Sequence, residues 1–155
     1  MALVKISRGA DIKHEYTNGV SRVPILEGAY KDAKVERISL QPGADLTPET
    51  YSKTEHNQVF LVTAGKGYIV TPRRVYNITE VSVFVPDFDK ESFTFHCAAD
   101  AKETMEIVHF VTELSDYDKT CLKEAHLTLP RFRGVSQAWH YKEDFTGADI
   151  QQMMM

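Results

Sequence analysis

The six histidines of this 155-residue sequence are its first candidates for metal binding and proton transfer. Three of them stand alone among other residue types, and we expect structural or exposed roles for His14, His126 and His140. His56 lies in a Glu-His-Asn run that is typical of a loop. His109 shares a predicted strand face with Met105 and Ile107, so it is either a hydrogen-bonded core histidine or a residue that lines a cavity. His96 shares its strand face with polar residues.

Tyr51, Lys53 and Glu55 alternate along the chain, and burial readily shifts the pKa values of lysine and tyrosine toward the range useful for acid–base chemistry. The same alternation is typical of a solvated strand face, and the sequence leaves both interpretations open. The two cysteines, Cys97 and Cys121, lie far apart and form no Cys-x-x-Cys pair. We therefore expect reduced thiols in a cytoplasmic protein.

The elements that must position these residues are short runs of β-branched and aromatic side chains, each bounded by a turn signal. The predicted strands are Val35–Leu40, Val59–Thr63, Tyr68–Thr71, Val81–Val85, Glu91–Cys97 and Thr104–Thr112. The Ala-Gly-Lys-Gly run at 64–67 predicts a hairpin loop between the second and third of these strands. A single short helix is predicted at 116–124, and 127–134 is expected to be extended.

The composition is that of an ordinary globular domain, with 43% hydrophobic and 26% charged residues. A formal net charge of −4 provides no basic surface, so we expect neither nucleic acid nor an anionic membrane as a partner. The apolar run at the N-terminus ends at Ile6 and is too short for a signal peptide. No apolar stretch approaches the roughly 20 residues of a membrane span.

The run Val-Phe-Leu-Val-Thr-Ala-Gly-Lys-Gly-Tyr-Ile at 59–69, together with Pro86 at the end of a later strand, resembles the cupin superfamily. The resemblance implies an all-β fold, the cupin-type double-stranded β-helix or jelly-roll barrel, with extensions at both ends. The barrel core would cover 35–114, the N-terminal extension 1–34 and the C-terminal extension 115–155. Two interpretations of the C-terminal extension stay open: an arm that packs on its own barrel, or an arm whose exposed aromatic residues pack on a partner subunit.

Most cupins hold a divalent metal with three histidines and a glutamate, and this sequence departs from that pattern. When the first cupin motif is counted back from Gly65, Gln58 takes the glutamate position, and Tyr51 and Lys53 take the paired histidine positions. A forward count from Gly43 places Glu49 and Tyr51 at the histidine positions instead. The second motif has Glu91 where the family has its third histidine. We therefore expect no bound cofactor, with a divalent metal at His56, His96 or His109 as the less favoured alternative.

These substitutions suggest a polar cluster inside the barrel in which a lysine replaces the metal charge and pairs with a carboxylate. The expected catalytic residues are Lys53, Glu91 and Tyr51, and the expected substrate-binding residues are Gln58, His109 and His96. The predicted function is binding of a small polar metabolite such as a sugar or sugar acid, with isomerase or lyase chemistry as one form of it. The alternative is a non-catalytic cupin module for ligand sensing or dimerisation. In either case we expect a homodimer.

Overall fold

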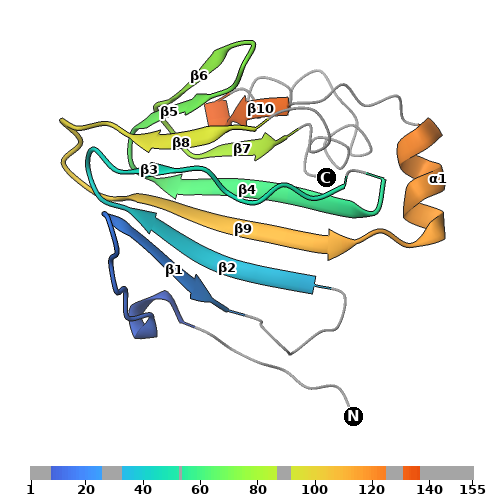
Figure 1. Ribbon diagram of the computed structural model, residues 1–155, viewed down its shortest axis with the longest axis horizontal. Coiled ribbons are helices and arrows are strands. Elements are labelled where there is room, and N and C mark those ends of the chain that lie inside the picture. The colour runs from blue at the N-terminus through green and yellow to red at the C-terminus, as the bar shows by residue number, and fades with distance from the viewer. Residues whose placement is uncertain (1–7, 26–32, 53, 87–91, 125–130, 137–155) are drawn as a thin grey trace.

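A computed structural model of the chain describes residues 8–25, 33–52, 54–86, 92–124 and 131–136. Within them lie a short 3-10 helix (η1), ten strands and one α-helix (Figure 1). Their bounds are η1 Gly9–Asp11, β1 Val20–Pro24, β2 Ala33–Leu40, β3 Asp45–Leu46, β4 His56–Ala64, β5 Gly67–Val70, β6 Val75–Ile78, β7 Ser82–Val85, β8 Thr94–Cys97, β9 Met105–Glu113, α1 Asp116–Glu124 and β10 Arg131–Gly134.

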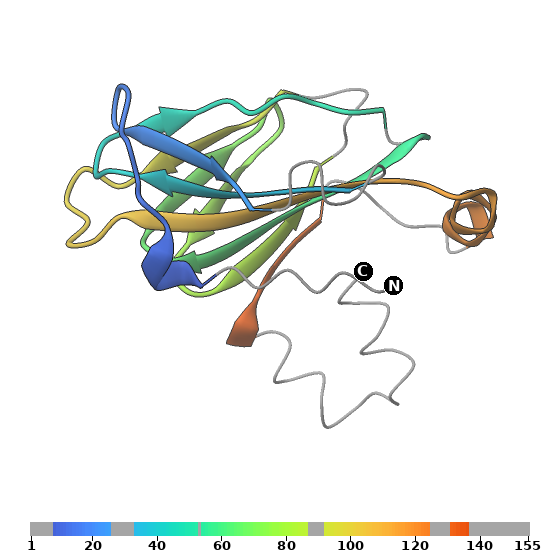
Figure 2. The same cartoon turned by 90° about the horizontal axis from the view of Figure 1, so that it is seen from below.

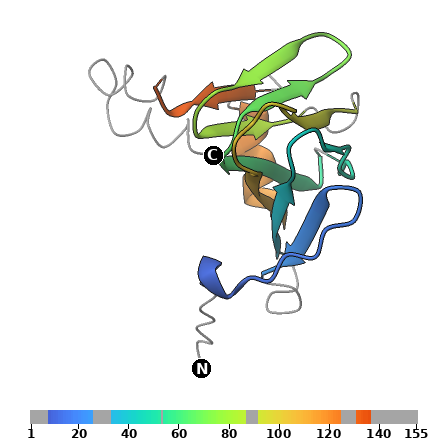
Figure 3. The same cartoon turned by 90° about the vertical axis from the view of Figure 1, so that its left-hand side faces the viewer.

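The strands form two antiparallel sheets that enclose the core. One sheet has six strands in the order β1-β2-β9-β4-β7-β10, and the other has four in the order β3-β8-β5-β6. Viewed from its left-hand side, the molecule has β1 and β2 at one margin and the β5–β6 hairpin at the other (Figure 3). The expected all-β jelly roll with a single short helix is therefore confirmed for the described residues.

The core follows from the alternation of side chains along the central strands. On β9 the side chains alternate between buried and partly exposed from Met105 to Val111, and β4 alternates in the same way from Gln58 to Val62. Phenylalanines from both sheets meet between them with ring centroids 5.0–6.1 Å apart. This aromatic cluster consists of Phe60, Phe84, Phe93 and Phe95. Large rings thus fill part of the space between the sheets.

The glycine-rich run at 64–67 connects the two sheets, and the prediction of a hairpin there was wrong. β4 belongs to the six-stranded sheet and β5 to the four-stranded sheet, so the chain crosses between layers at this point. Gly65 has a φ of +91°, and a Cβ on it would lie 2.5 Å from the Cα of Met105. A Cβ on Gly67 would lie 1.9 Å from the carbonyl oxygen of His96. Both glycines permit a close backbone approach that no side chain allows.

The helix α1 begins where the sequence predicts. Its N-terminus is capped by Ser115, whose Oγ accepts from the backbone N–H of Asp118 at 3.2 Å, while the Asp118 carboxylate accepts from the backbone N–H of Ser115 at 3.0 Å. The helix lies beyond the end of β9, at one end of the molecule (Figure 2). Cys121 is exposed on this helix, whereas Cys97 lies in the core. Among the described residues, no helix has the length and apolar character needed to cross a membrane.

Candidate functional site

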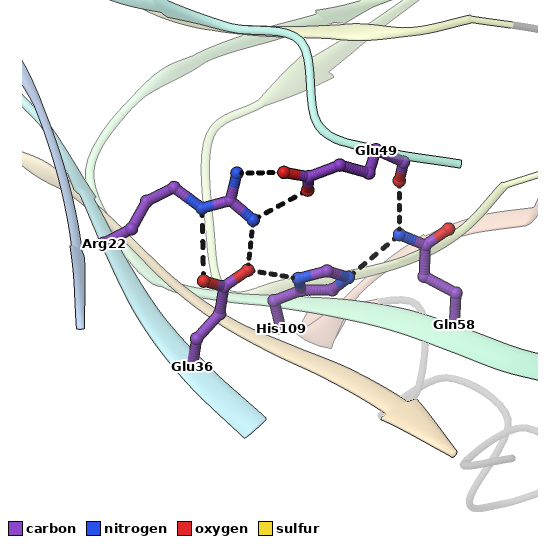
Figure 4. A network of polar contacts seen from close by, with 5 residues as sticks. All are labelled: Arg22, Glu36, Glu49, Gln58 and His109. Carbon is purple, nitrogen blue, oxygen red and sulfur yellow. Dashed lines mark hydrogen bonds and ion pairs between the residues drawn. The ribbon is translucent and has the colours of Figure 1, made fainter. Parts of the chain in front are cut away.

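A line of polar side chains interrupts the apolar inner face of the six-stranded sheet. Glu36 on β2 lies directly opposite His109 on β9, and His109 lies directly opposite Phe60 on β4. Gln58, two residues before Phe60, shares its face, and Arg22 projects from β1 at the margin of the sheet (Figure 4). Side chains two residues apart on a strand point the same way, and directly opposite residues on paired strands share a face. Four strands therefore contribute to one continuous row of side chains.

Arg22 contacts two carboxylates through two edges of its guanidinium group (Figure 4). Its Nε donates to Glu36 Oε2 at 3.1 Å, and its Nη2 donates to Glu36 Oε1 at 2.5 Å. The other edge donates to Glu49, from Nη1 to Oε1 at 2.9 Å and from Nη2 to Oε2 at 2.8 Å. Such bidentate contacts are stronger than single hydrogen bonds and fix the orientation of the guanidinium group.

Glu36 orients the imidazole of His109. Glu36 Oε1 lies 2.7 Å from His109 Nδ1, and Gln58 Nε2 lies 2.9 Å from His109 Nε2. An ionised carboxylate can only accept hydrogen bonds, so Nδ1 of His109 carries the proton and donates it to the hydrogen bond with Glu36. Nε2 of the neutral ring then accepts from the Gln58 amide, whose second N–H donates to the backbone carbonyl of Glu49 at 3.0 Å. The ring also stacks on Phe60, with centroids 4.2 Å apart and an interplanar angle of 3°.

Direct contacts set the ionisation of the charged groups in this network. Burial of Glu36 opposes its ionisation, but the hydrogen bonds from His109 and Arg22 outweigh burial and lower its pKa to about 2. The hydrogen bonds from Glu36 and Glu49 raise the pKa of Arg22, and Arg22 in turn lowers the pKa of Glu49. The carboxylate of Glu36 therefore stays ionised at neutral pH although it is only 3% exposed.

Two buried polar atoms beside this network have no hydrogen-bond partner among the described residues. They are Oε1 of Gln58 and Nδ1 of His56, which share the inner face of β4. The His56 ring also faces Tyr51, with centroids 5.3 Å apart. A buried acceptor without a donor costs about 1–3 kcal/mol, so such atoms mark a place where a ligand or a water molecule supplies the missing contact.

The structure brings together some of the residues that the sequence singled out and separates others. Gln58 and His109 are in direct contact, and Tyr51 lies beside His56 at the same end of β4. His96 lies on the opposite side of its strand from the buried Phe95, stacked on Tyr68 and hydrogen-bonded to Asp45. It is therefore on the outer face of the four-stranded sheet, away from the network. Lys53 and Glu91 lie outside the described residues, so their catalytic roles stay predictions.

The sequence patterns did not single out Arg22 and Glu36, and they reached Glu49 only through the forward count from Gly43. Glu36 did carry a signal, because it shares its strand face with Ile38 and Leu40 and so places a charge on an apolar face. Arg22 lies 14 residues from Glu36, and His109 lies 73 residues from it, so no local motif links the three.

A divalent metal of the cupin type does not fit the described residues of this network. Both nitrogens of His109 already have partners, and an amide stands at Gln58, where the family has a carboxylate. The guanidinium of Arg22 neutralises Glu36, the nearest carboxylate. No group of three or more histidine, cysteine, aspartate or glutamate side chains among the described residues could hold a metal ion.

Comparison with solved structures identifies the fold. KdgF from Halomonas sp. aligns with a TM-score of 0.58 at 12% identity, over 74% of this chain and 98% of that one. A cupin-2 domain from Rhodospirillum rubrum aligns with a TM-score of 0.52 at 16% identity, over 78% of this chain and 86% of that one.

The chain has the cupin fold. A sugar phosphate isomerase of the cupin superfamily, from Silicibacter pomeroyi, shares that fold with a TM-score of 0.51 at 17% identity, over 62% of this chain and 60% of that one. The sequence matches no protein-family model, and no curated protein is similar to it. At these identities the likeness extends to the fold alone.

Proposed function

We propose that this cupin binds a small polyhydroxylated metabolite, a sugar or sugar acid, at the inner face of β4 and β9. The observation that carries the proposal is the buried Oε1 of Gln58, which lies beside the ring of His109 and has no hydrogen-bond partner in the described part of the chain. A ligand hydroxyl can donate to this oxygen, and a second hydroxyl can contact Nδ1 of His56. The fold shared with a sugar phosphate isomerase supports this ligand class.

The same geometry supports proton transfer without the usual histidine-rich metal site. Glu36 holds the proton of His109 on Nδ1, which leaves Nε2 as the basic atom of the ring. When a ligand takes over the Gln58 amide, Nε2 is free to accept a proton from a carbon or hydroxyl of that ligand. Isomerisation and lyase reactions of sugars both require such a step. We therefore propose His109 as the general base and Glu36 as the residue that orients it.

A titration of the protein with D-glucose, D-galactose, D-glucuronate and D-galacturonate, followed by NMR, tests binding. Incorporation of deuterium from D₂O into the bound sugar tests proton transfer. We expect His109→Gln to reduce the exchange rate at least about 100-fold, the usual contribution of a general base, with little change in affinity. The matched control is His96→Gln, the same substitution on the outer sheet face, which should change neither measurement.

Failure of all four sugars to bind would contradict the proposal. Binding without any deuterium exchange would favour the second candidate, a non-catalytic module for ligand sensing. One observation favours that candidate: the aromatic cluster of Phe60, Phe84, Phe93 and Phe95 fills part of the interior, and each ring is at most 2% exposed. The predicted homodimer stays a prediction, because it rests on the family resemblance and on aromatic residues of the segment 137–155, which lies outside the described residues.

A further inference from the structure

The two carboxylates bound by Arg22 are held very differently. Glu36 lies on β2, is buried, and is hydrogen-bonded to His109 as well as to Arg22. Glu49 lies outside the strands, between β3 and β4, and its side chain is 58% exposed. Solvent screens a pair with so exposed a partner, so it is the weaker of the two bidentate contacts of Arg22 and contributes about 1 kcal/mol or less. The contact between Arg22 and Glu49 is therefore the one that another carboxylate can replace.

Glu49 also restrains the amide of Gln58. Its backbone carbonyl accepts from Gln58 Nε2 at 3.0 Å, while its carboxylate binds Arg22 (Figure 4). A displacement of this residue thus releases Arg22 and Gln58 together. The amide of Gln58 is then free to turn, and Nε2 of His109 loses the contact that now covers it.

The charges around Glu49 favour an anion in its place. Among the described residues, the charges of Arg22 and Lys34 both lower the pKa of the Glu49 carboxylate. Lys34 lies two residues before Glu36 on β2 and therefore shares its face. Without the charge of Glu49, the described part of the network retains two cations, Arg22 and Lys34, and one carboxylate, Glu36. A ligand carboxylate restores the balance, whereas a neutral sugar does not.

We propose that Arg22 is the carboxylate-recognition residue of this cupin and that Glu49 is an internal carboxylate which an acidic sugar displaces on binding. This inference rests on the proposed function and narrows its ligand class to sugar acids. Displacement of Glu49 couples carboxylate binding to proton transfer. The ligand that releases Glu49 also frees the Gln58 amide, which covers Nε2 of His109. A neutral sugar cannot make the bidentate contact that compensates for the lost ion pair.

The test compares the affinity for D-galacturonate with that for D-galactose, which lacks the carboxylate. In Glu49→Gln we expect the Kd for galacturonate to fall about two- to fivefold, because an exposed ion pair of this strength no longer competes. The Kd for galactose should stay unchanged. The matched control is Glu55→Gln, which removes an exposed ion pair to Lys119 next to the same segment and should leave both values unchanged.

A second variant, Arg22→Lys, keeps the charge but lacks the planar fork, and we expect it to weaken galacturonate binding at least about tenfold. If this variant does not fold, Glu49→Gln still decides the question, since its side chain is exposed. Equal binding of galactose and galacturonate, unchanged in Glu49→Gln, would overturn this inference while the proposed function stands. If neither sugar binds to any of these proteins, both proposals fail.

Discussion

Replacement of Glu36 by glutamine is the most informative perturbation of the network. The substitution keeps the size of the side chain and an acceptor for His109 Nδ1, but it removes the charge that faces Arg22. The pKa of Glu36 is lowered from 4.5 to about 2. At about 1.4 kcal/mol per pKa unit, this shift corresponds to about 3 kcal/mol of folding free energy at neutral pH.

The pH dependence of this effect has a definite sign. Because the pKa of Glu36 is lower in the folded state, its contribution is complete above pH 4.5 and is lost as the pH falls toward about 2. We expect Glu36→Gln to be about 3 kcal/mol less stable than the wild type at pH 7 and about 1.5 kcal/mol less stable at pH 3. Other carboxylates titrate in both proteins, so the difference between them isolates Glu36.

Urea unfolding followed by circular dichroism at pH 7, 5, 4 and 3 measures this difference. Glu55→Gln serves as the control, because it removes only an exposed ion pair with Lys119 and should change the free energy of unfolding at pH 7 much less than Glu36→Gln does. A difference between wild type and Glu36→Gln that stays constant from pH 7 to pH 3 would refute the reasoning. It would mean that the charge of Glu36 does not stabilise the folded state.

Three further predictions concern the turn and the network. Gly65→Ala should destabilise the fold by about 2 kcal/mol or more in chemical denaturation, because its Cβ would lie 2.5 Å from a backbone atom. Gly43 also has a positive φ, but the nearest atom to a Cβ there is 3.9 Å away, so Gly43→Ala should cost only about 1 kcal/mol. Equal effects would contradict the packing argument. Gln58→Leu removes the donor to His109 and to a backbone carbonyl, and thermal or urea unfolding should show a loss of about 1–3 kcal/mol. Nitrogen-15 NMR at neutral pH should find the His109 proton on Nδ1, and a proton on Nε2 alone would reverse the assigned hydrogen bonds.

Local patterns were sufficient for most of the elements. The run Val35–Leu40 lies within β2, Val59–Thr63 within β4, and Thr104–Thr112 matches β9 to within one residue at each end, because β-branched side chains at alternating positions suit a half-buried strand. Strands of two to five residues without such a run, namely β1, β3 and β6, were not predicted. The pairing of β3 depends on β8, which is distant in the sequence, whereas β6 forms a hairpin with the neighbouring β5.

What the sequence alone determined is the side on which each strand residue lies, since this depends only on alternation. Alternation placed His109 among core residues, and it places Glu36 on the same strand face as apolar residues. Tertiary structure decided which of these residues meet. The glycine run at 64–67 became a crossing between sheets, and Arg22, Glu36, His109 and Gln58 came together from four strands. The register between strands that are far apart in the chain sets such contacts, and that register results from packing of the whole core rather than from any short segment.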